Sequence, residues 1–377
     1  MTLARGSTAN VTSVEHSPRR RVLVLFGGRS SEHSISCVSA AGILRALDPA
    51  RYDITAVGIL PDGRWVRVPA DPAALDATDG QLPVVVDSGQ PVALLPEPVG
   101  QREALPAEVL RGVDVVFPVL HGPWGEDGTI QGLLEMAGIS FVGSGVFASA
   151  VAMDKGHMKA MLAHAAIPVG PWQLVTSREW AADPTACLAR ISTLGFPLFV
   201  KPARAGSSVG ISRVSDPTAL EAAVREAHSW DPRVIAEAAI EGAREIECGV
   251  LADPSGAPQA SRCAEIIVHP DHDFYDFEAK YLDDGAELIV PAQLDPVVEE
   301  RVRELAVRAF DALDCEGLAR VDFFVTGDDV LLNEVNTMPG FTPISMYPRM
   351  WGASGIGYHE LVDRLIDDAV RKGTGLR

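Results

Sequence analysis

The stretch ARVDFFVTGDDVLLNEVN, residues 319–336, predicts a β-hairpin with polar side chains on one face. Side chains alternate across a strand, so Arg320 and Asp322 share a face of the first strand. Glu334 and Asn336 share a face of the second strand for the same reason. A three-residue loop would set Asp322 opposite Glu334, with Cβ atoms about 5 Å apart. Arg320 would then lie opposite Asn336, so the four polar side chains would form one cluster.

The oxygen atoms of this cluster predict a site for a divalent cation. Two carboxylates and an amide, from Asp322, Glu334 and Asn336, are hard ligands that suit Mg²⁺ or Mn²⁺ better than zinc. The alternative is a solvated outer face, because apolar side chains on the other face would produce the same alternation. Those side chains are Val321, Phe323, Leu331 and Val335. The metal interpretation is favoured because clustered acids must pair or bind cations.

The size and charge of the chain limit what it binds. At 377 residues the chain exceeds one average core, which predicts two or three domains. Its net charge of -19 would repel nucleic acid and anionic membranes, so neither is expected as a partner. The five cysteines form no C-x-x-C pair, which argues against a zinc site and fits a reducing compartment. We therefore expect a cytoplasmic protein.

An open α/β domain is predicted over residues 21–146, after a flexible N-terminal tail of residues 1–20. The tail has no apolar central stretch, so it does not resemble a signal peptide. The strand VLVLF is followed by the loop GGRSSEHS, a helix and the strand YDITAVGIL. A later strand ends in HGPWGEDG, and ligand-binding groups gather at such strand ends. Residues 69–106 are interpreted only as an insertion of short elements.

Two further units are predicted, at residues 147–236 and 237–377. The first is expected to hold a helix over 149–165 and a strand, PLFVKPA, that leads through a glycine-rich loop into ISRV. The segments RVIAEAAI, EIECGVLA and AEIIVH then predict an antiparallel series. A loop at 270–285 precedes the long helix DPVVEERVRELAVRAFDALD and the final hairpin. The fold class is therefore a combination of α/β and α+β.

The loop KPARAGSSVG, residues 201–210, predicts a hairpin that binds phosphate. Its small residues let backbone N–H groups point at phosphates while Lys201 neutralises their charge. The alternative, an ordinary hairpin turn, explains the glycines but not a lysine within an apolar strand. Because the chain uses arginine far more often than lysine, a retained lysine indicates a place that needs a compact ammonium group.

Several blocks in the same order resemble the D-alanine:D-alanine ligases of the ATP-grasp superfamily. Besides the two motifs above they are GGRSSEHSIS, HGPWGEDG, GSGVFASAVAMDK, FYDFEAKY and NTMPGFTPIS, which span most of residues 21–348. The resemblance implies an ATP-grasp fold preceded by a Rossmann-like domain. It implies that ATP drives the joining of two D-alanines through an acyl phosphate, for peptidoglycan precursor synthesis. ATP and two Mg²⁺ or Mn²⁺ ions are the implied cofactors, and a homodimer is expected.

The resemblance implies an ATP site built from several segments. The matching residues are Lys155 and Lys201 for the phosphates, Glu237, Ala238 and Ile240 for the adenine edge, Glu245 for the ribose, Phe274 for stacking on the ring, and Ser207, Ser208 and Lys280 as further contacts. The segment EAAIEGAREIE is one residue longer than the usual family spacing, so Glu247 is a rival to Glu245. An edge-strand carboxylate without a ligand is the other alternative for Glu245.

The resemblance also implies groups that hold and activate D-alanine. Glu32 would bind the ammonium of the first D-alanine and join a hydrogen-bonded set with Ser207 and Tyr281. A glutamate that caps the start of a helix is the alternative for Glu32. The other matching residues are His121 and Lys280 in the substrate pocket, Ser345 for the carboxylate of the second D-alanine, and Arg320 with the N–H of Gly340 for the oxyanion. The loop at 270–285 would cover the acyl phosphate, and Tyr281 favours a dipeptide product.

Three other functions stay open at this point. A ligase of the same superfamily for another acid and amine would share the phosphate and metal groups but would not need Glu32 or Ser345. A dinucleotide-binding oxidoreductase would explain VLFGGRSSE alone, but the sequence there lacks G-x-G-x-x-G. A non-catalytic ATP sensor would not need the full set of reactive groups.

Overall fold

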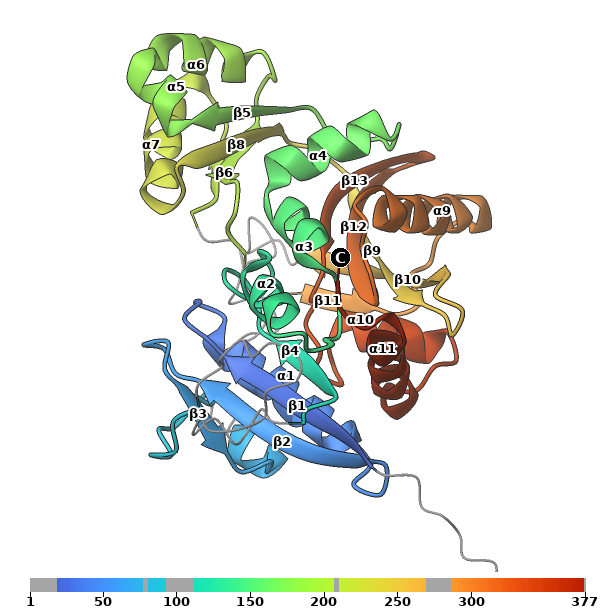
Figure 1. The fold of residues 1–377 in the computed structure, drawn as a ribbon. Coiled ribbons are helices and arrows are strands. Elements are labelled where there is room, and N and C mark those ends of the chain that lie inside the picture. The colour runs from blue at the N-terminus through green and yellow to red at the C-terminus, as the bar shows by residue number, and fades with distance from the viewer. Residues whose placement is uncertain (1–18, 77–80, 93–111, 207–209, 269–285, 376–377) are drawn as a thin grey trace, which may run out of the picture.

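The computed structural model describes most of the chain, and the described residues form three β-sheets. The described residues are 19–76, 81–92, 112–206, 210–268 and 286–375. Figure 1 shows the N-terminal sheet at the bottom, a five-stranded sheet in the middle and a four-stranded sheet at the top. Within the described ranges, the helices are all too short or too polar to cross a membrane.

The N-terminal sheet has the strand order β3-β2-β1-β4. Its strands are β1 (Arg20–Gly27), β2 (Tyr52–Ile59), β3 (Trp65–Val68) and β4 (Val115–Val119), and the 3-10 helix η1 (Pro72–Leu75) follows β3. β1 pairs in parallel with β2 and β4, whereas β3 is antiparallel to β2. Alternate residues of β1 enter two separate cores, one with α1 (His33–Ala46) and one with α2 (Thr129–Met136). The sheet is therefore buried on both faces, as its continuous apolar strands require.

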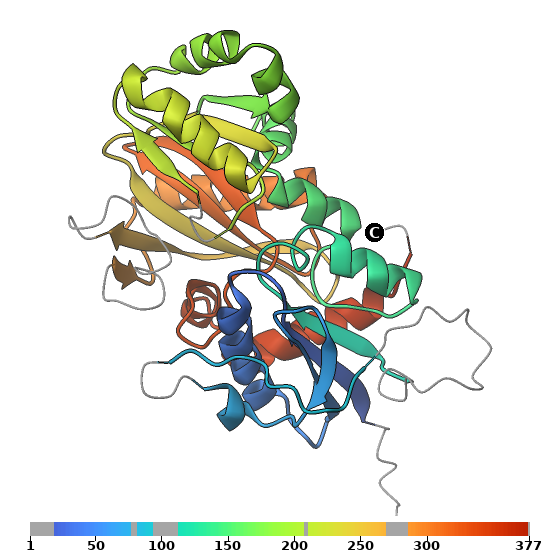
Figure 2. The same cartoon turned by 90° about the vertical axis from the view of Figure 1, so that its left-hand side faces the viewer.

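The last helix of the chain completes the first of these cores. α11 (Tyr358–Lys372) buries Leu361 and Leu365 in the same cluster as Val24 of β1 and Ile43 of α1. Figures 1 and 2 both show red α11 beside the blue N-terminal sheet. Contacts thus join the end of the chain to its first domain, an arrangement that sequence order does not indicate.

The four-stranded sheet at the top of Figure 1, which is distinct from the N-terminal sheet, has the order β5-β8-β6-β7 and is antiparallel throughout. Its strands are β5 (Trp172–Thr176), β6 (Leu198–Pro202), β7 (Ser212–Val214) and β8 (Arg233–Ala238), and its helices are α5 (Ser177–Ala182), α6 (Pro184–Ser192), η3 (Pro217–Ala219) and α7 (Leu220–Trp230). The predicted glycine-rich hairpin joins β6 to β7. RVIAEAAI supplies β8, which pairs with β5 and β6 and not with EIECGVLA. The predicted antiparallel series is wrong at this first member, because the chain passes to another sheet after Ala238.

Two short helices, α3 (Val146–Met153) and α4 (Lys155–His164), replace the single helix predicted over 149–165. The break lies at Asp154, which has extended backbone angles (φ -87°, ψ 97°). Its carboxylate accepts a hydrogen bond from the backbone N–H of His157 at 3.1 Å and pairs with Arg233 at 2.8 Å. Such capping starts a new helix, whose first residue is Lys155.

The five-stranded sheet has the order β11-β10-β9-β12-β13 and is also antiparallel throughout. Its strands are β9 (Arg244–Ala252), β10 (Pro258–Val268), β11 (Ala286–Ile289), β12 (Leu318–Thr326) and β13 (Asp329–Asn336). The predicted long helix is α9 (Pro296–Ala312), capped by Asp295, and it packs with Cys263 on one face. α10 (Met346–Ala353) packs with Ala264 on the other face. Successive residues of β10 thus belong to separate cores, so each face is covered.

The hairpin of β12 and β13 has the predicted pairing but a different turn. Arg320 lies opposite Asn336 and Asp322 opposite Glu334, as predicted. Thr326 pairs with Asp329, so the loop has two residues, and a bulge at Asn333 restores the register by adding one residue to β13. The predicted three-residue loop is therefore wrong. The prediction that Leu331 faces the core is also wrong, because the side chain buried beyond the turn is Leu332, which is 0% exposed.

Candidate active site

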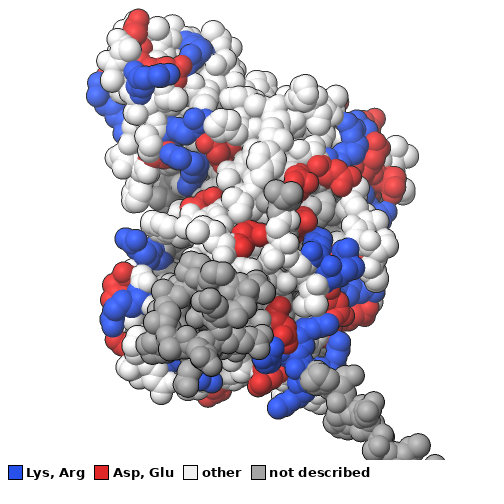
Figure 3. All heavy atoms as spheres, viewed as in Figure 1, with Lys and Arg blue, Asp and Glu red and all other residues white. Residues whose placement is uncertain are grey.

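The two sheets other than the N-terminal sheet, together with α1 and loops of the N-terminal part, line one cavity of about 810 Å³. Every predicted site residue that the structure describes lines this cavity: Glu32, His121, Lys155, Lys201, Glu237, Ala238, Ile240, Glu245, Arg320, Asp322, Glu334, Asn336, Gly340 and Ser345. The other predicted site residues, Ser207, Ser208, Phe274, Lys280 and Tyr281, lie outside the described residues, as does the loop at 270–285. Among the described residues on the face shown in Figure 3, acidic and basic side chains are interspersed.

On the polar face of the β12–β13 hairpin, carboxylate and amide groups lie next to positively charged side chains. Arg320 donates from Nε to Asp322 Oδ1 at 2.8 Å and from its terminal nitrogen to Oδ2 at 2.7 Å. Asn336 donates from Nδ2 to the same carboxylate at 3.0 Å. Lys155 Nζ lies 3.5 Å from Glu334 Oε2. The carboxylates are thus stabilised by positive charge, and their residue types fit a hard divalent cation.

The amide of Asn336 matters for such a cation. No group of three His, Cys, Asp or Glu side chains with metal-holding geometry occurs in the described ranges. On this hairpin the protein ligands would be the carboxylates of Asp322 and Glu334 with the amide oxygen of Asn336, a small set of the kind that Mg²⁺ completes with water and phosphate. The amide donates from its nitrogen to Asp322 here, and its oxygen is the atom that would bind a metal.

Arg320 has a second acidic partner, which the sequence suggested for another role. Glu247 on β9 is 4% exposed, and its Oε1 lies 3.2 Å from Arg320 Nε. Burial acts to lower the pKa of Arg320, but Asp322 and Glu247 outweigh it and hold that pKa well above its usual value. The guanidinium is therefore permanently charged and fixed from two strands.

Three lysines and one further glutamate line the cavity next to the β12–β13 hairpin. Glu237 on β8 forms ion pairs with Lys201 on β6 and with Lys159 on α4. Burial acts to raise the pKa of Glu237, but the two ammonium groups lower it to about 2. Lys155, at the start of α4, donates from Nζ to the carbonyl of Ala205 at 3.1 Å. The glycine-rich loop and α4 thus meet through a lysine, and Glu237 is ionised.

Glu32 does not cap the helix that follows it. It stands just before α1, but its side chain accepts no hydrogen bond from the first turn of that helix. A Cβ atom added at Gly122 would lie 2.6 Å from Glu32 Oε2, and one at Gly206 would lie 3.0 Å from it. Only glycines therefore leave room for the carboxylate, and Gly122 also has a left-handed backbone (φ +74°). The capping alternative is wrong.

His121 is held at both ring nitrogens. Nδ1 lies 3.0 Å from the carbonyl oxygen of Met338, so this nitrogen carries the proton and donates. Nε2 lies 3.1 Å from Ser39 Oγ and accepts from that hydroxyl. Burial lowers the pKa of His121, although the charge of Glu32 opposes the effect. The imidazole is therefore neutral and ties the end of β4 to the turn after β13.

That turn presents Gly340 and Ser345 to the cavity. A Cβ atom at Gly340 would lie 3.2 Å from Ser345 Oγ, so the two residues are in contact. The Ser345 hydroxyl accepts from the backbone N–H of Thr342 at 3.1 Å. Tyr358 donates to the carbonyl of Phe341 at 2.5 Å, so α11 supports the turn from behind.

Sequence reasoning missed Glu126, which lies five residues after His121 in the quoted loop HGPWGEDG. Its carboxylate accepts from the backbone N–H of Gly122 at 2.8 Å and of Met338 at 3.4 Å. Burial, together with the charge of Glu32, raises the pKa of Glu126 to about 8. The feature of the sequence that could have identified Glu126 is an acidic residue that follows His121 within a glycine-rich loop.

Glu126 predicts a pH-dependent stability for the ligand-free protein. The unfolded carboxyl ionises near 4.5, whereas the folded one holds its proton up to about 8. Between these two pH values the folded chain binds more protons than the unfolded chain. The contribution of Glu126 to the free energy of unfolding therefore falls as the pH rises and is constant above about pH 8. We expect Glu126→Gln to gain thermal stability over the wild type at pH 9 but not at pH 4. The exposed Glu226→Gln is the control, and an equal response of both variants would contradict the assignment.

Family models match nearly the whole chain. One, described as D-ala D-ala ligase N-terminus, matches residues 21–144, and one described as D-ala D-ala ligase C-terminus matches residues 161–367. A D-alanine--D-alanine ligase of Mycobacterium avium (strain 104) is 55% identical over 371 residues, covering 96% of this chain and 99% of the relative. Its counterpart in Mycolicibacterium smegmatis is 54% identical over 378 residues, covering 97% and 100%.

Solved structures match the fold as well. The D-alanine-D-alanine ligase from Coxiella burnetii has a TM-score of 0.78 and 36% identity, covering 94% of this chain and 95% of that one. VanG D-Ala:D-Ser ligase from Enterococcus faecalis has a TM-score of 0.79 and 33% identity, covering 93% and 100%. These similarities extend over all three sheets.

Proposed function

The chain belongs to the D-alanine–D-alanine ligase family, and from this premise we propose how its residues perform the reaction. The protein is an ATP-dependent ligase that joins two D-alanines into D-alanyl-D-alanine for peptidoglycan synthesis. The observation that carries our assignment is the 3.5 Å approach of Lys155 to Glu334. This contact brings Lys155, which we assign to the ATP phosphates, next to the β12–β13 hairpin, which we assign to the metal ion and call the metal hairpin. A nucleotide whose phosphates are bound by both groups requires them to be side by side.

We propose that ATP lies between the sheet β5-β8-β6-β7 and the five-stranded sheet. Lys155 and Lys201 neutralise its phosphates, and the strand that ends at Ala238 reads the adenine edge through backbone groups with Ile240. Glu245 binds the ribose, because its rival Glu247 is already paired with Arg320. Ser207, Ser208, Phe274 and Lys280 complete the site by resemblance.

Asp322, Glu334 and Asn336 are proposed to hold Mg²⁺ or Mn²⁺, with two ions expected. Such ions, when bound, neutralise the charge that develops on transferring phosphoryl groups. The chain itself supplies the geometry, because Asp322 and Glu334 face each other across one ladder.

Glu32 is proposed to anchor the ammonium of the first D-alanine beside the neutral His121. The carboxylate oxygen of that D-alanine attacks the γ-phosphorus of ATP, the bond to the β-phosphate breaks, and ADP leaves. The product is an acyl phosphate. The amine of a second D-alanine, with its carboxylate on Ser345, attacks the carbonyl carbon. Its proton passes to the hydrogen-bonded set of Glu32, Ser207 and Tyr281, and phosphate departs.

Arg320 and the N–H of Gly340 are proposed to stabilise the oxyanion of this second attack. One donor of this kind contributes about 3 kcal/mol to transition-state stabilisation. Arg320 suits the task because two carboxylates fix its guanidinium before substrate arrives. Fixed dipoles and charges need no reorganisation during the reaction.

The remaining assignments concern the whole molecule. We propose a tail (1–20) and units at 21–146, 147–236 and 237–377, with a lid at 270–285. We also propose that the protein acts in the cytoplasm, where ATP is available, and that it is a homodimer. Light scattering on the purified chain tests the dimer.

A phosphate-release assay tests the substrate assignment. With ATP and Mg²⁺, we expect phosphate release with D-alanine but not with L-alanine. Adding D-lactate to limiting D-alanine should cause little additional release. D-Serine belongs in the same assay, because one structural relative is a D-Ala:D-Ser ligase. Release that is insensitive to D-alanine would favour another acid and amine, and no release at all would favour an ATP sensor.

A further inference from the structure

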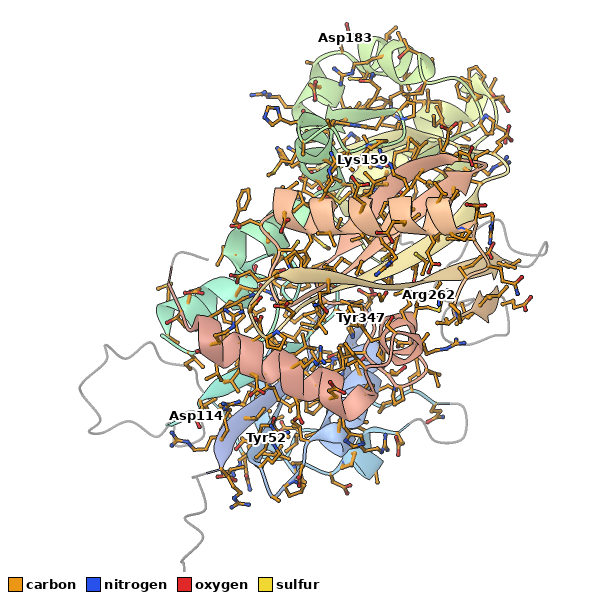
Figure 4. All side chains as sticks on the ribbon, turned by 90° about the vertical axis from the view of Figure 1, so that its right-hand side faces the viewer. Tyr52, Asp114, Lys159, Asp183, Arg262 and Tyr347 are labelled. Carbon is orange, nitrogen blue, oxygen red and sulfur yellow. The ribbon has the colours of Figure 1, made fainter. Side chains whose placement is uncertain are left out.

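Lys159 is a buried lysine to which the proposed mechanism gives no task. It lies on α4, one turn after Lys155, and is 3% exposed. Its Nζ lies 2.8 Å from Glu237 Oε1 and donates to the carbonyl oxygen of Asn333 at 3.0 Å. Figure 4 labels Lys159 at the level where the four-stranded sheet meets the five-stranded sheet. Its partners come from one strand of each sheet.

The charge balance around Glu237 depends on this lysine. Lys201 pairs with the other oxygen of Glu237, so one carboxylate is shared by two ammonium groups. The set therefore carries a net charge of about +1 when all three groups are ionised. If Lys159 were absent, Glu237 and Lys201 would form a neutral pair. The ammonium of Lys201 would then be bound to its carboxylate and would attract phosphate less strongly, since buried charges interact strongly.

We propose that Lys159 is a positioning residue that neutralises Glu237 and so leaves the positive charge of Lys201 available to the nucleotide phosphates. This inference rests on the proposed role of Lys201. Lys159 does not take the phosphates itself, because its ammonium is directed at Glu237 and at the backbone of β13. Its contact with Asn333 also reaches the bulge that sets the register of the metal hairpin.

The test is a charge series at these positions, read as the KM for ATP against kcat and against the KM for D-alanine. Lys159→Met should raise the KM for ATP about tenfold or more, since hydrogen bonds to charged groups are among the strong ones. It should change the KM for D-alanine by less than about twofold. Adding Glu237→Gln to Lys159→Met removes the carboxylate that retains Lys201, so the KM for ATP should return toward the wild-type value. The dissociation constant of ADP, measured at equilibrium, should follow the same order.

A purely structural lysine would give a different pattern. A general distortion of the active site would change kcat and both KM values together, and the double variant would bind ATP no better than Lys159→Met. Either that result or an unchanged KM for ATP in Lys159→Met would overturn the inference. Thermal melting establishes that each variant is folded at the assay temperature. Lys372→Met, which removes a lysine paired with Asp368 at 2.9 Å and outside the cavity, is the matched control and should leave all parameters unchanged.

The failure of the underlying proposal would look different again. If Lys201→Ala leaves ATP binding unchanged, Lys201 does not hold the phosphates and the proposed function is wrong at that point. If Lys201→Ala weakens ATP binding but the charge series shows no rescue, only the role of Lys159 is wrong.

Discussion

Lys201→Ala should lower kcat roughly a hundredfold to a thousandfold while the protein stays folded. The ammonium of Lys201 lies in the cavity, and Glu237 and Glu334 hold its pKa above the usual value although burial acts to lower it. It is therefore charged at every pH at which the enzyme would be assayed. Loss of one preorganised charged donor has an effect of this size in other enzymes. Steady-state kinetics with saturating D-alanine measures it.

The fold should survive because Glu237 keeps a partner. A buried carboxylate that loses its last cation destabilises a protein strongly. Here Lys159 still lies 2.8 Å from Glu237 Oε1 after Lys201 is removed. Lys372→Ala, outside the cavity, is the control for the loss of a lysine that pairs with acids. A Lys201→Ala enzyme that kept more than a tenth of the wild-type kcat would contradict the phosphate role.

Local patterns in the sequence were sufficient for the parts of the site that lie on single elements. Alternation together with an assumed three-residue loop placed Asp322 and Glu334 opposite each other on the ladder, and the structure confirms the pairing. It did so although the predicted turn was one residue too long, because the bulge at Asn333 makes up the difference. A bulge is set by how a strand packs on its neighbours, and no residue type at that position signals it.

Contacts between distant segments could not be derived in the same way. The charge on Glu237 is balanced from α4 and β6, and Glu126 reaches from the loop after β4 to the turn after β13. These partners are far apart in the chain and share no periodic pattern. The position of α11 against the first sheet is a similar case, since its amphipathic sequence predicts a buried face but not the surface that covers it.

Glu334→Gln should raise the Mg²⁺ concentration needed for half-maximal rate and lower kcat roughly a hundredfold or more, since a bound metal contributes several kcal/mol to charge stabilisation. Glutamine keeps the shape of the side chain and one oxygen, so the hairpin pairing with Asp322 is retained. Lys155 loses a carboxylate at 3.5 Å but keeps its hydrogen bond to Ala205. The variant therefore removes charge without leaving a buried group unpaired.

The binding of Mn²⁺ in the presence of ADP, followed by electron paramagnetic resonance, separates a metal role from a general loss of activity. Asp329→Asn removes an acid from the exposed end of the same strand and serves as the matched control, with binding and kcat unchanged. Both variants lose one negative charge from the same hairpin, so the change in the net charge of the protein is common to them. A selective loss of Mn²⁺ binding in Glu334→Gln would therefore come from the position of Glu334 and not from the net charge. Equal Mn²⁺ affinities in Glu334→Gln and the wild type would rule out this hairpin as the metal site.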